Sequence, residues 1–115
     1  TFGFWWTGFY RVNGNQLVLG PFQGPLACSR IGYGKGVCGT AWKEQATQVV
    51  ADVELFPGHI ACSSLSRSEI VVPVWRGDKV VAVLDIDSEH LATFDDIDRT
   101  WLEKIVGLLY TANMG

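Results

Sequence analysis

The side chains best suited to chemistry in this 115-residue chain are three cysteines and three acids. Cys28, Cys38 and Cys62 lie ten and twenty-four residues apart, in glycine-rich or loop-like surroundings. Buried cysteines are often inert core residues, but a placement outside any apolar strand argues against that role for at least two of the three. Such thiols suit redox chemistry, in which one thiolate attacks an oxidised substrate, becomes a sulfenic acid and is resolved by a second thiol.

A zinc site is the alternative use of these thiols. Three cysteines and His59 would supply four tetrahedral ligands, but structural zinc sites usually present paired ligands two to four residues apart. Only His59 and Cys62 have that spacing. The spacing therefore favours redox thiols, and we expect neither a metal ion nor another cofactor.

The three acids belong to two apolar segments joined by a tight turn at residues 76–78. Asp85 and Asp87 are two residues apart, so they face the same side of a strand. Antiparallel pairing through the turn places residues whose numbers sum to 155 opposite one another, which puts Glu69 across from Ile86 and the three acids at one end of the sheet. If they are partly buried, mutual repulsion raises at least one pKa and creates a general acid; acids at strand ends are more often simply solvated.

The same arrangement suits a small zwitterion, because carboxylates can hold an ammonium group while an aromatic wall holds an apolar tail. Candidates for that wall stand near the start of the chain: Phe4, Trp5, Trp6, Phe9 and Tyr10. Aromatic residues in strands usually pack in the core. We therefore expect most of these rings to be core and one or two to face a pocket.

The elements that position these groups follow from turn residues and hydrophobic periodicity. A hairpin is predicted around Asn13-Gly14, and a second, with strands buried on both faces, around Gly77. Helices are expected at 36–45 and 95–112, a further strand at 47–50 and a long connection at 51–67. Cys38 would lie in the first turn of the first helix, where the helix dipole stabilises a thiolate.

The closing helix is predicted to present one apolar stripe to the sheet, formed by Phe94, Ile97, Trp101, Ile105 and Leu108. Thr93 and Asp96 match a loose capping box at its start. Together the elements predict an α+β domain with a central, mainly antiparallel sheet and flanking helices.

Composition limits the class of protein. The chain is 48% hydrophobic and 18% charged, which indicates one compact domain over residues 1–115. Its nine basic residues are scattered, against twelve acidic ones, so a nucleic-acid partner is not expected. No apolar stretch approaches the ~20 residues of a membrane span, and no secretion signal opens the chain. We therefore expect a cytoplasmic protein without a membrane partner.

Six sequence motifs follow one another over nearly the whole chain: WTGFY at 6–10, LGPFQG at 19–24 followed by Ala27-Cys28, GKGVCGTA at 34–41, GHIACSS at 58–64, SEIVVPV at 68–74 and VLDIDS at 83–88. Together they closely resemble the motifs of free methionine-(R)-sulfoxide reductases, which are GAF-domain enzymes. The combination of GHIAC with SEI and LDIDS is far more specific than any single motif.

The resemblance implies a thiol-dependent reduction of free L-methionine-(R)-sulfoxide to L-methionine, with thioredoxin as the reductant. It makes Cys62 the nucleophile that becomes a sulfenic acid and Cys28 the principal resolving cysteine. It leaves the role of Cys38 open, with an auxiliary resolving thiol as one choice. Glu69 and Asp87 match the family acids that polarise or protonate the sulfoxide oxygen, and Asp85 matches an acid that binds the substrate. Trp6 matches the aromatic residue that packs on the substrate methyl group.

Two departures from the family and one competing function accompany the resemblance. The family has a longer N-terminal region with a helix before the tryptophan-containing strand, and we expect that region to be absent from this single GAF domain. Trp5 and Thr7 flank Trp6 where the family more often has asparagine and an aliphatic residue. A homodimer is left open. The competing functions are a GAF-type small-molecule sensor and a thiol redox switch without turnover, because fold alone does not decide function.

Overall fold

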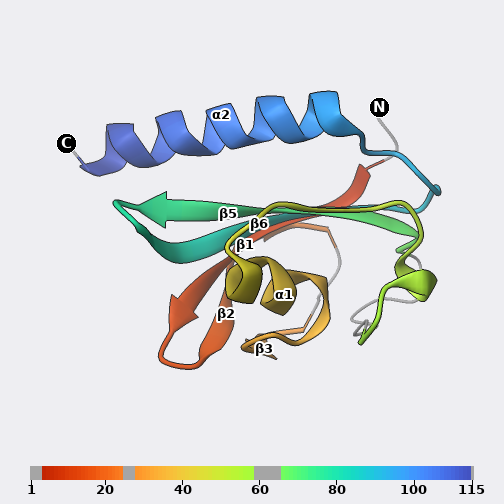
Figure 1. The fold of residues 1–115 in the computed structure, drawn as a ribbon, viewed down its shortest axis with the longest axis horizontal. Helices are drawn as coiled ribbons and strands as arrows, with labels where there is room; N and C mark the ends of the chain where they lie inside the picture. Colours follow the sequence, from red (N-terminus) through yellow and green to blue (C-terminus); the bar gives the residue numbers. More distant parts are fainter. Residues whose placement is uncertain (1–3, 25–27, 59–65, 115) are drawn as a thin grey trace.

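Six strands form one antiparallel sheet, in the order β3-β2-β1-β6-β5-β4 (Figure 1). The structure is a computed structural model that describes residues 4–24, 28–58 and 66–114. The strands are β1 (Phe4–Asn13), β2 (Gln16–Gln23), β3 (Arg30–Gly32), β4 (Gln48–Val50), β5 (Ser68–Arg76) and β6 (Lys79–Ser88). The helices are α1 (Gly36–Glu44), the short 3-10 helix η1 (Val53–Leu55) and α2 (Asp96–Met114). The predicted α+β class is confirmed.

Both predicted hairpins form around their glycines. Gly14 and Gly77 each have a φ of 64°, a conformation that glycine adopts without steric cost. The sequence predicts the second strand of the first hairpin over residues 16–19, followed by an irregular loop, but β2 continues to Gln23. The predicted burial of the second hairpin also holds: most of β5 and β6 is buried.

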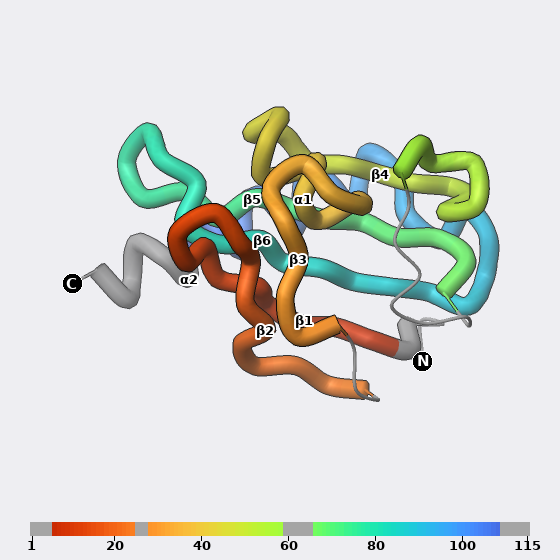
Figure 2. The backbone as a smooth tube through the Cα atoms, turned by 90° about the horizontal axis from the view of Figure 1, so that it is seen from below, coloured from red at the N-terminus to blue at the C-terminus, as the bar shows by residue number. Residues whose placement is uncertain are grey.

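The two α-helices, α1 and α2, cover opposite faces of the sheet. Figure 1 shows α2 running along one side of β5 and β6, and Figure 2, viewed from below, shows α1 and β3 on the near side with α2 behind the sheet. Each face has its own apolar core. On the α1 face, Tyr10, Leu17, Val71 and Val83 are almost completely buried, and on the α2 face Ile70 and Val72 are.

The expected inner stripe of α2 is wrong except for Phe94, which precedes the helix and is buried. Ile97, Trp101, Ile105 and Leu108 are exposed. The residues that pack towards the sheet are instead Leu102 and Val106, with Phe94. Apolar residues occur on both sides of this helix, and its docking on the strands decides which side is buried. No helix in the described residues has the length and hydropathy needed to cross a membrane.

The start of α2 is capped two residues later than expected. The Asp95 carboxylate accepts hydrogen bonds from the backbone N–H groups of Ile97 and Asp98, and an Asp98 carboxylate oxygen accepts one from the N–H of Asp95. This reciprocal pair satisfies free N–H groups of the first turn as a capping box does. Thr93 bonds instead to the Ser88 hydroxyl, so the predicted pairing of Thr93 with Asp96 is wrong.

Candidate active site

The three acids lie together on the α1 face at one end of the sheet. Asp87 is directly opposite Glu69 in β5 and opposite Trp6 in β1. Asp85 is opposite Val71 in β5 and, on its other side, faces β1 at Gly8. Since paired residues of antiparallel strands share a face, this register brings the three carboxyl groups and the Trp6 indole to one place.

The expected register is correct only beside the turn, where Arg76 pairs with Lys79 and Trp75 with Val80. A β-bulge then inserts Val81 into β6, so that Val74 pairs with Ala82 and every later pair is shifted by one residue. The predicted pairing of Glu69 with Ile86 is therefore wrong. The bulge matters for the site, because without it Glu69 would face the opposite side of the sheet from the two aspartates.

The acids are buried with little to offset their charge. Glu69, Asp85 and Asp87 are 7%, 5% and 9% exposed. Burial and the neighbouring carboxylates raise all three pKa values well above the ordinary range, that of Asp87 to about 9. The group therefore retains protons at neutral pH, and its members titrate as one coupled set. The one salt bridge among the described residues joins Arg99 to Asp96 on α2. No cationic side chain described in the structure therefore pairs with these three acids.

One carboxyl oxygen of this cluster is buried, lacks a hydrogen-bond partner in the described part of the chain and could accept a bond from a ligand. Oδ1 of Asp85 is buried and has no hydrogen-bond partner among the described residues. A buried polar atom without a partner costs about 1–3 kcal/mol. A substrate group that donates a hydrogen bond or carries positive charge would remove this cost, so the cluster is built to receive an ammonium group or a proton-bearing oxygen.

Cys38 joins the cluster from α1. Its buried Sγ lies 4.0 Å from Oε2 of Glu69, and burial together with the nearby acids raises the pKa of the thiol well above its usual value. The predicted thiolate is therefore wrong, because burial and the three carboxyl groups outweigh the helix N-terminus. Ligand atoms of Cys38, Glu69 and Asp85 lie within 4.8 Å of one another, close enough to share one metal ion.

The Trp6 indole lies beside the acids and is part of a stack of aromatic rings. The Trp6 indole lies between Tyr10 and Phe22, with ring centroids 6.0 and 5.8 Å away and interplanar angles of 28° and 16°. Gly8 makes this possible, because a Cβ at that position would overlap the indole and the Phe22 side chain. Trp6 thus lies flat across its own strand beside the acids, and Tyr10 belongs to the core, as expected of most of these rings.

The outer cysteines are only partly described. Cys28 is partly buried and disulfide-bonded in this structure, and its carbonyl oxygen accepts a 2.8 Å hydrogen bond from the Tyr10 hydroxyl. Cys62 and His59 lie outside the described residues. Of the seven expected site residues, the structure therefore brings together Trp6, Cys38, Glu69, Asp85 and Asp87, and it places Cys28 one hydrogen bond away from the Trp6–Tyr10 pair.

Two buried serines that the sequence analysis did not single out brace the acid strands. Ser68 precedes Glu69, and its hydroxyl donates to the His90 carbonyl oxygen and accepts from the Thr93 N–H. Ser88 follows Asp87, and its hydroxyl pairs with that of Thr93 at 2.7 Å. The signal available in the sequence was the serine next to each acid. These bonds tie the loop before α2 to the acid end of the sheet.

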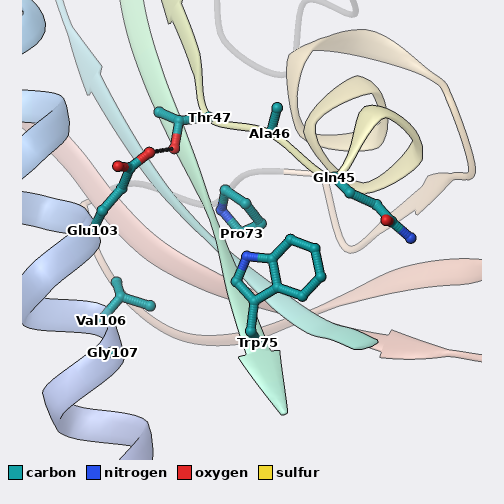
Figure 3. A pocket seen from close by; sticks show the side chains of 8 residues that line it. All are labelled: Gln45, Ala46, Thr47, Pro73, Trp75, Glu103, Val106 and Gly107. Atoms are coloured by element: carbon teal, nitrogen blue, oxygen red, sulfur yellow. Dashed lines mark hydrogen bonds between the residues drawn. The ribbon is translucent and has the colours of Figure 1, made fainter. Parts of the chain in front are cut away.

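A separate pocket of about 310 Å³ lies at the other end of β5, where Pro73 and Trp75 meet α2 and residues 45–47 (Figure 3). The Thr47 hydroxyl donates to Glu103 across it. Its lining has neither a thiol nor a buried acid. Among the described residues, the buried acids and the free Cys38 thiol therefore lie away from this pocket, at the other end of β5.

These features define a small α+β domain that holds a buried, acidic, thiol-containing site against an aromatic wall. Comparison with known proteins gives this class a name. The family model described as "GAF domain" matches residues 1–112. GAF domain-containing protein A of Dictyostelium discoideum is 58% identical over 109 residues, covering 94% of this chain and 69% of that protein.

Two solved structures are also similar. Free methionine-R-sulfoxide reductase of Neisseria meningitidis in complex with its substrate has a TM-score of 0.91 and 56% identity, covering 94% of this chain and 66% of that one. The reduced form of the Staphylococcus aureus reductase has a TM-score of 0.88 and 57% identity, covering 90% and 68%. The chain therefore belongs to the GAF-domain family and, within it, to the free methionine-R-sulfoxide reductases. It spans about two thirds of the length of these relatives.

Proposed function

We propose that this chain reduces free L-methionine-(R)-sulfoxide to L-methionine. The observation that carries the proposal is the buried cluster of Glu69, Asp85 and Asp87 beside Trp6, in a chain that is 56% identical to a reductase whose structure holds its substrate. A sulfoxide is a poor electrophile until its oxygen is protonated or strongly hydrogen-bonded. Carboxyl groups that keep their protons at neutral pH supply that activation.

Each acid has a distinct task in this proposal. Glu69 and Asp87 face each other across β5 and β6 and donate to the sulfoxide oxygen, and the pKa of Asp87, raised to about 9, keeps its proton available. Asp85, with its free buried Oδ1, holds the substrate ammonium. Trp6 packs on the methyl group. A peptide-bound sulfoxide has no ammonium at this position and would leave Asp85 without a partner, which favours the free amino acid.

The thiol chemistry follows in two balanced steps. The Cys62 thiolate attacks the substrate sulfur, the protonated oxygen moves to the cysteine as a sulfenic acid, and methionine leaves. The Cys28 thiol then attacks the sulfenic sulfur, an S–S bond forms, and the S–O bond breaks with release of water. The disulfide-bonded state of Cys28 and the free state of Cys38 support Cys28 as the resolving residue. Thioredoxin would return the disulfide to thiols.

A single-turnover assay tests the proposal. Reduced protein is mixed with the separated R and S forms of free methionine sulfoxide and with an R-sulfoxide peptide, and methionine and lost thiols are counted. We expect methionine from the free R form alone, with two thiols lost per turnover. Cys62→Ser should form none, whereas Cys28→Ser should still complete one turnover. Thiol loss without methionine would identify a redox switch, and binding without either would identify a sensor.

A further inference from the structure

We propose that Tyr10 is a positioning residue for the second thiol step: its hydroxyl holds the backbone of Cys28 so that this cysteine reaches the sulfenic acid. The inference rests on the proposed function, because it needs Cys28 as the resolving thiol. It gives Tyr10, which the sequence offered only as the end of the WTGFY motif and as a candidate aromatic ring, a role in the thiol chemistry.

The contact itself is specific. The Tyr10 ring is 1% exposed, and its hydroxyl donates to the Cys28 carbonyl oxygen at 2.8 Å, across 18 residues of sequence. A buried phenol needs such an acceptor, because leaving its O–H without a partner would cost about 1–3 kcal/mol. The next backbone carbonyl, that of Ser29, accepts a 2.9 Å hydrogen bond from the N–H of Leu19 in β2. Consecutive carbonyls of the Cys28 segment are thus fixed to β1 and β2.

The tyrosine that bonds to the Cys28 backbone lies at the site rather than in a distant part of the core. Tyr10 stacks on Trp6, and both rings lie on the face of β1 that meets the acids of β6. The nearby Cys38 and the three acids add to burial in raising the pKa of the Tyr10 phenol, so the hydroxyl stays a donor at any working pH. One hydrogen bond between neutral groups therefore links the Trp6–Tyr10 ring pair to the backbone of the proposed resolving cysteine.

This geometry separates the two chemical steps. The Tyr10 hydroxyl points at the Cys28 backbone, and reduction of the sulfoxide needs neither. Disulfide formation needs the Cys28 thiol held where it can attack, and loss of one ordering hydrogen bond would slow that step by about tenfold. The change should appear as a longer-lived sulfenic acid, with formation of the first methionine unaffected.

The test compares Tyr10→Phe with Tyr33→Phe in the reduced chain. Each substitution removes one phenolic oxygen, but Tyr33 is half exposed and its ring lies edge-on to Trp42 with the centroids 4.7 Å apart. Among the described residues, the phenol that bonds to the Cys28 carbonyl is that of Tyr10. After mixing with free methionine-(R)-sulfoxide, methionine release, dimedone-trapped sulfenic acid and disulfide are followed in time. Thermal unfolding of both variants confirms that they are folded.

We expect Tyr10→Phe to release its first methionine at the rate of the parent, to accumulate trappable sulfenic acid and to form the disulfide about tenfold more slowly. Tyr33→Phe should match the parent in all three. An unchanged rate of disulfide formation in Tyr10→Phe would overturn the inference. A rate of methionine release that falls as much as the rate of disulfide formation would also overturn it, because it would place Tyr10 in substrate reduction. Absence of methionine from the parent chain would instead refute the proposed function, so the two failures are distinguishable.

Discussion

The two faces of the β5–β6 hairpin are built from alternating residues of the same strands and do different work. On the α1 face, Glu69, Asp85 and Asp87 bury carboxyl groups whose pKa values burial raises. On the α2 face, their sequence neighbours Ile70 and Ile86 pack in an apolar core. Burying acids opposes folding, while burying the isoleucines favours it. The hairpin therefore carries the proposed chemistry on one face, and the apolar packing on the other face offsets the cost of burying the acids.

Glu69→Gln should give the largest change, and only in activity. The amide keeps the size of the side chain but cannot supply the proton of a carboxylic acid, so methionine formation should fall by about 100- to 10,000-fold. The free energy of unfolding should not decrease, because the buried acid must keep a proton that the unfolded chain releases at neutral pH, whereas the amide has no such cost. Single-turnover rates and urea unfolding measure the two quantities. An unchanged rate would remove Glu69 from the acid role.

Ile70→Ala, one residue further along β5, should do the reverse. Ile70 is fully buried against the α2 face, and its truncation should lower the free energy of unfolding by about 3 kcal/mol. The rate of methionine formation per folded molecule should remain that of the parent, because the side chain points away from the acids. A loss of activity in Ile70→Ala much larger than its unfolded fraction explains would contradict the division of roles between the two faces.

The parts of this architecture set by local chemistry could be predicted from sequence. Asn13-Gly14 and Gly77 fix two hairpins, and acids two residues apart in β6 had to share a face. That Glu69 lies on the same face of the sheet as the two aspartates could not be predicted, because the bulge at Val81 has no glycine or proline to mark it. The direction of the pKa shift of the Cys38 thiol was predicted wrongly for a related reason. The helix N-terminus is local and visible in the sequence, whereas the burial of the thiol and its contact with the acids arise only in the tertiary fold.

The acid face should also make stability depend on pH. Burial raises the pKa of Asp87 from an ordinary 3.8 to about 9, so between these values the folded chain holds a proton that the unfolded chain has released. The stabilising effect of this proton is complete below pH 4 and is lost as pH rises towards 9. Unfolding free energies measured between pH 5 and 9 should therefore fall, and Asp87→Asn should make that fall smaller. An equally steep fall in Asp87→Asn would assign the dependence to other groups.

The smallest effect is expected outside both faces, on the solvent side of α2. Trp101 is 61% exposed and its ring is contacted by the Lys104 ammonium at 5.6 Å, whereas Phe94, just before the helix, is buried against the sheet. Trp101→Ala should change the free energy of unfolding of this chain by no more than about 0.5 kcal/mol. Phe94→Ala should lower it by about 3 kcal/mol. The contrast separates hydrophobicity from burial, because the larger ring should matter less. Equal losses in the two variants would show that the stripe of Ile97, Trp101, Ile105 and Leu108 is covered in solution.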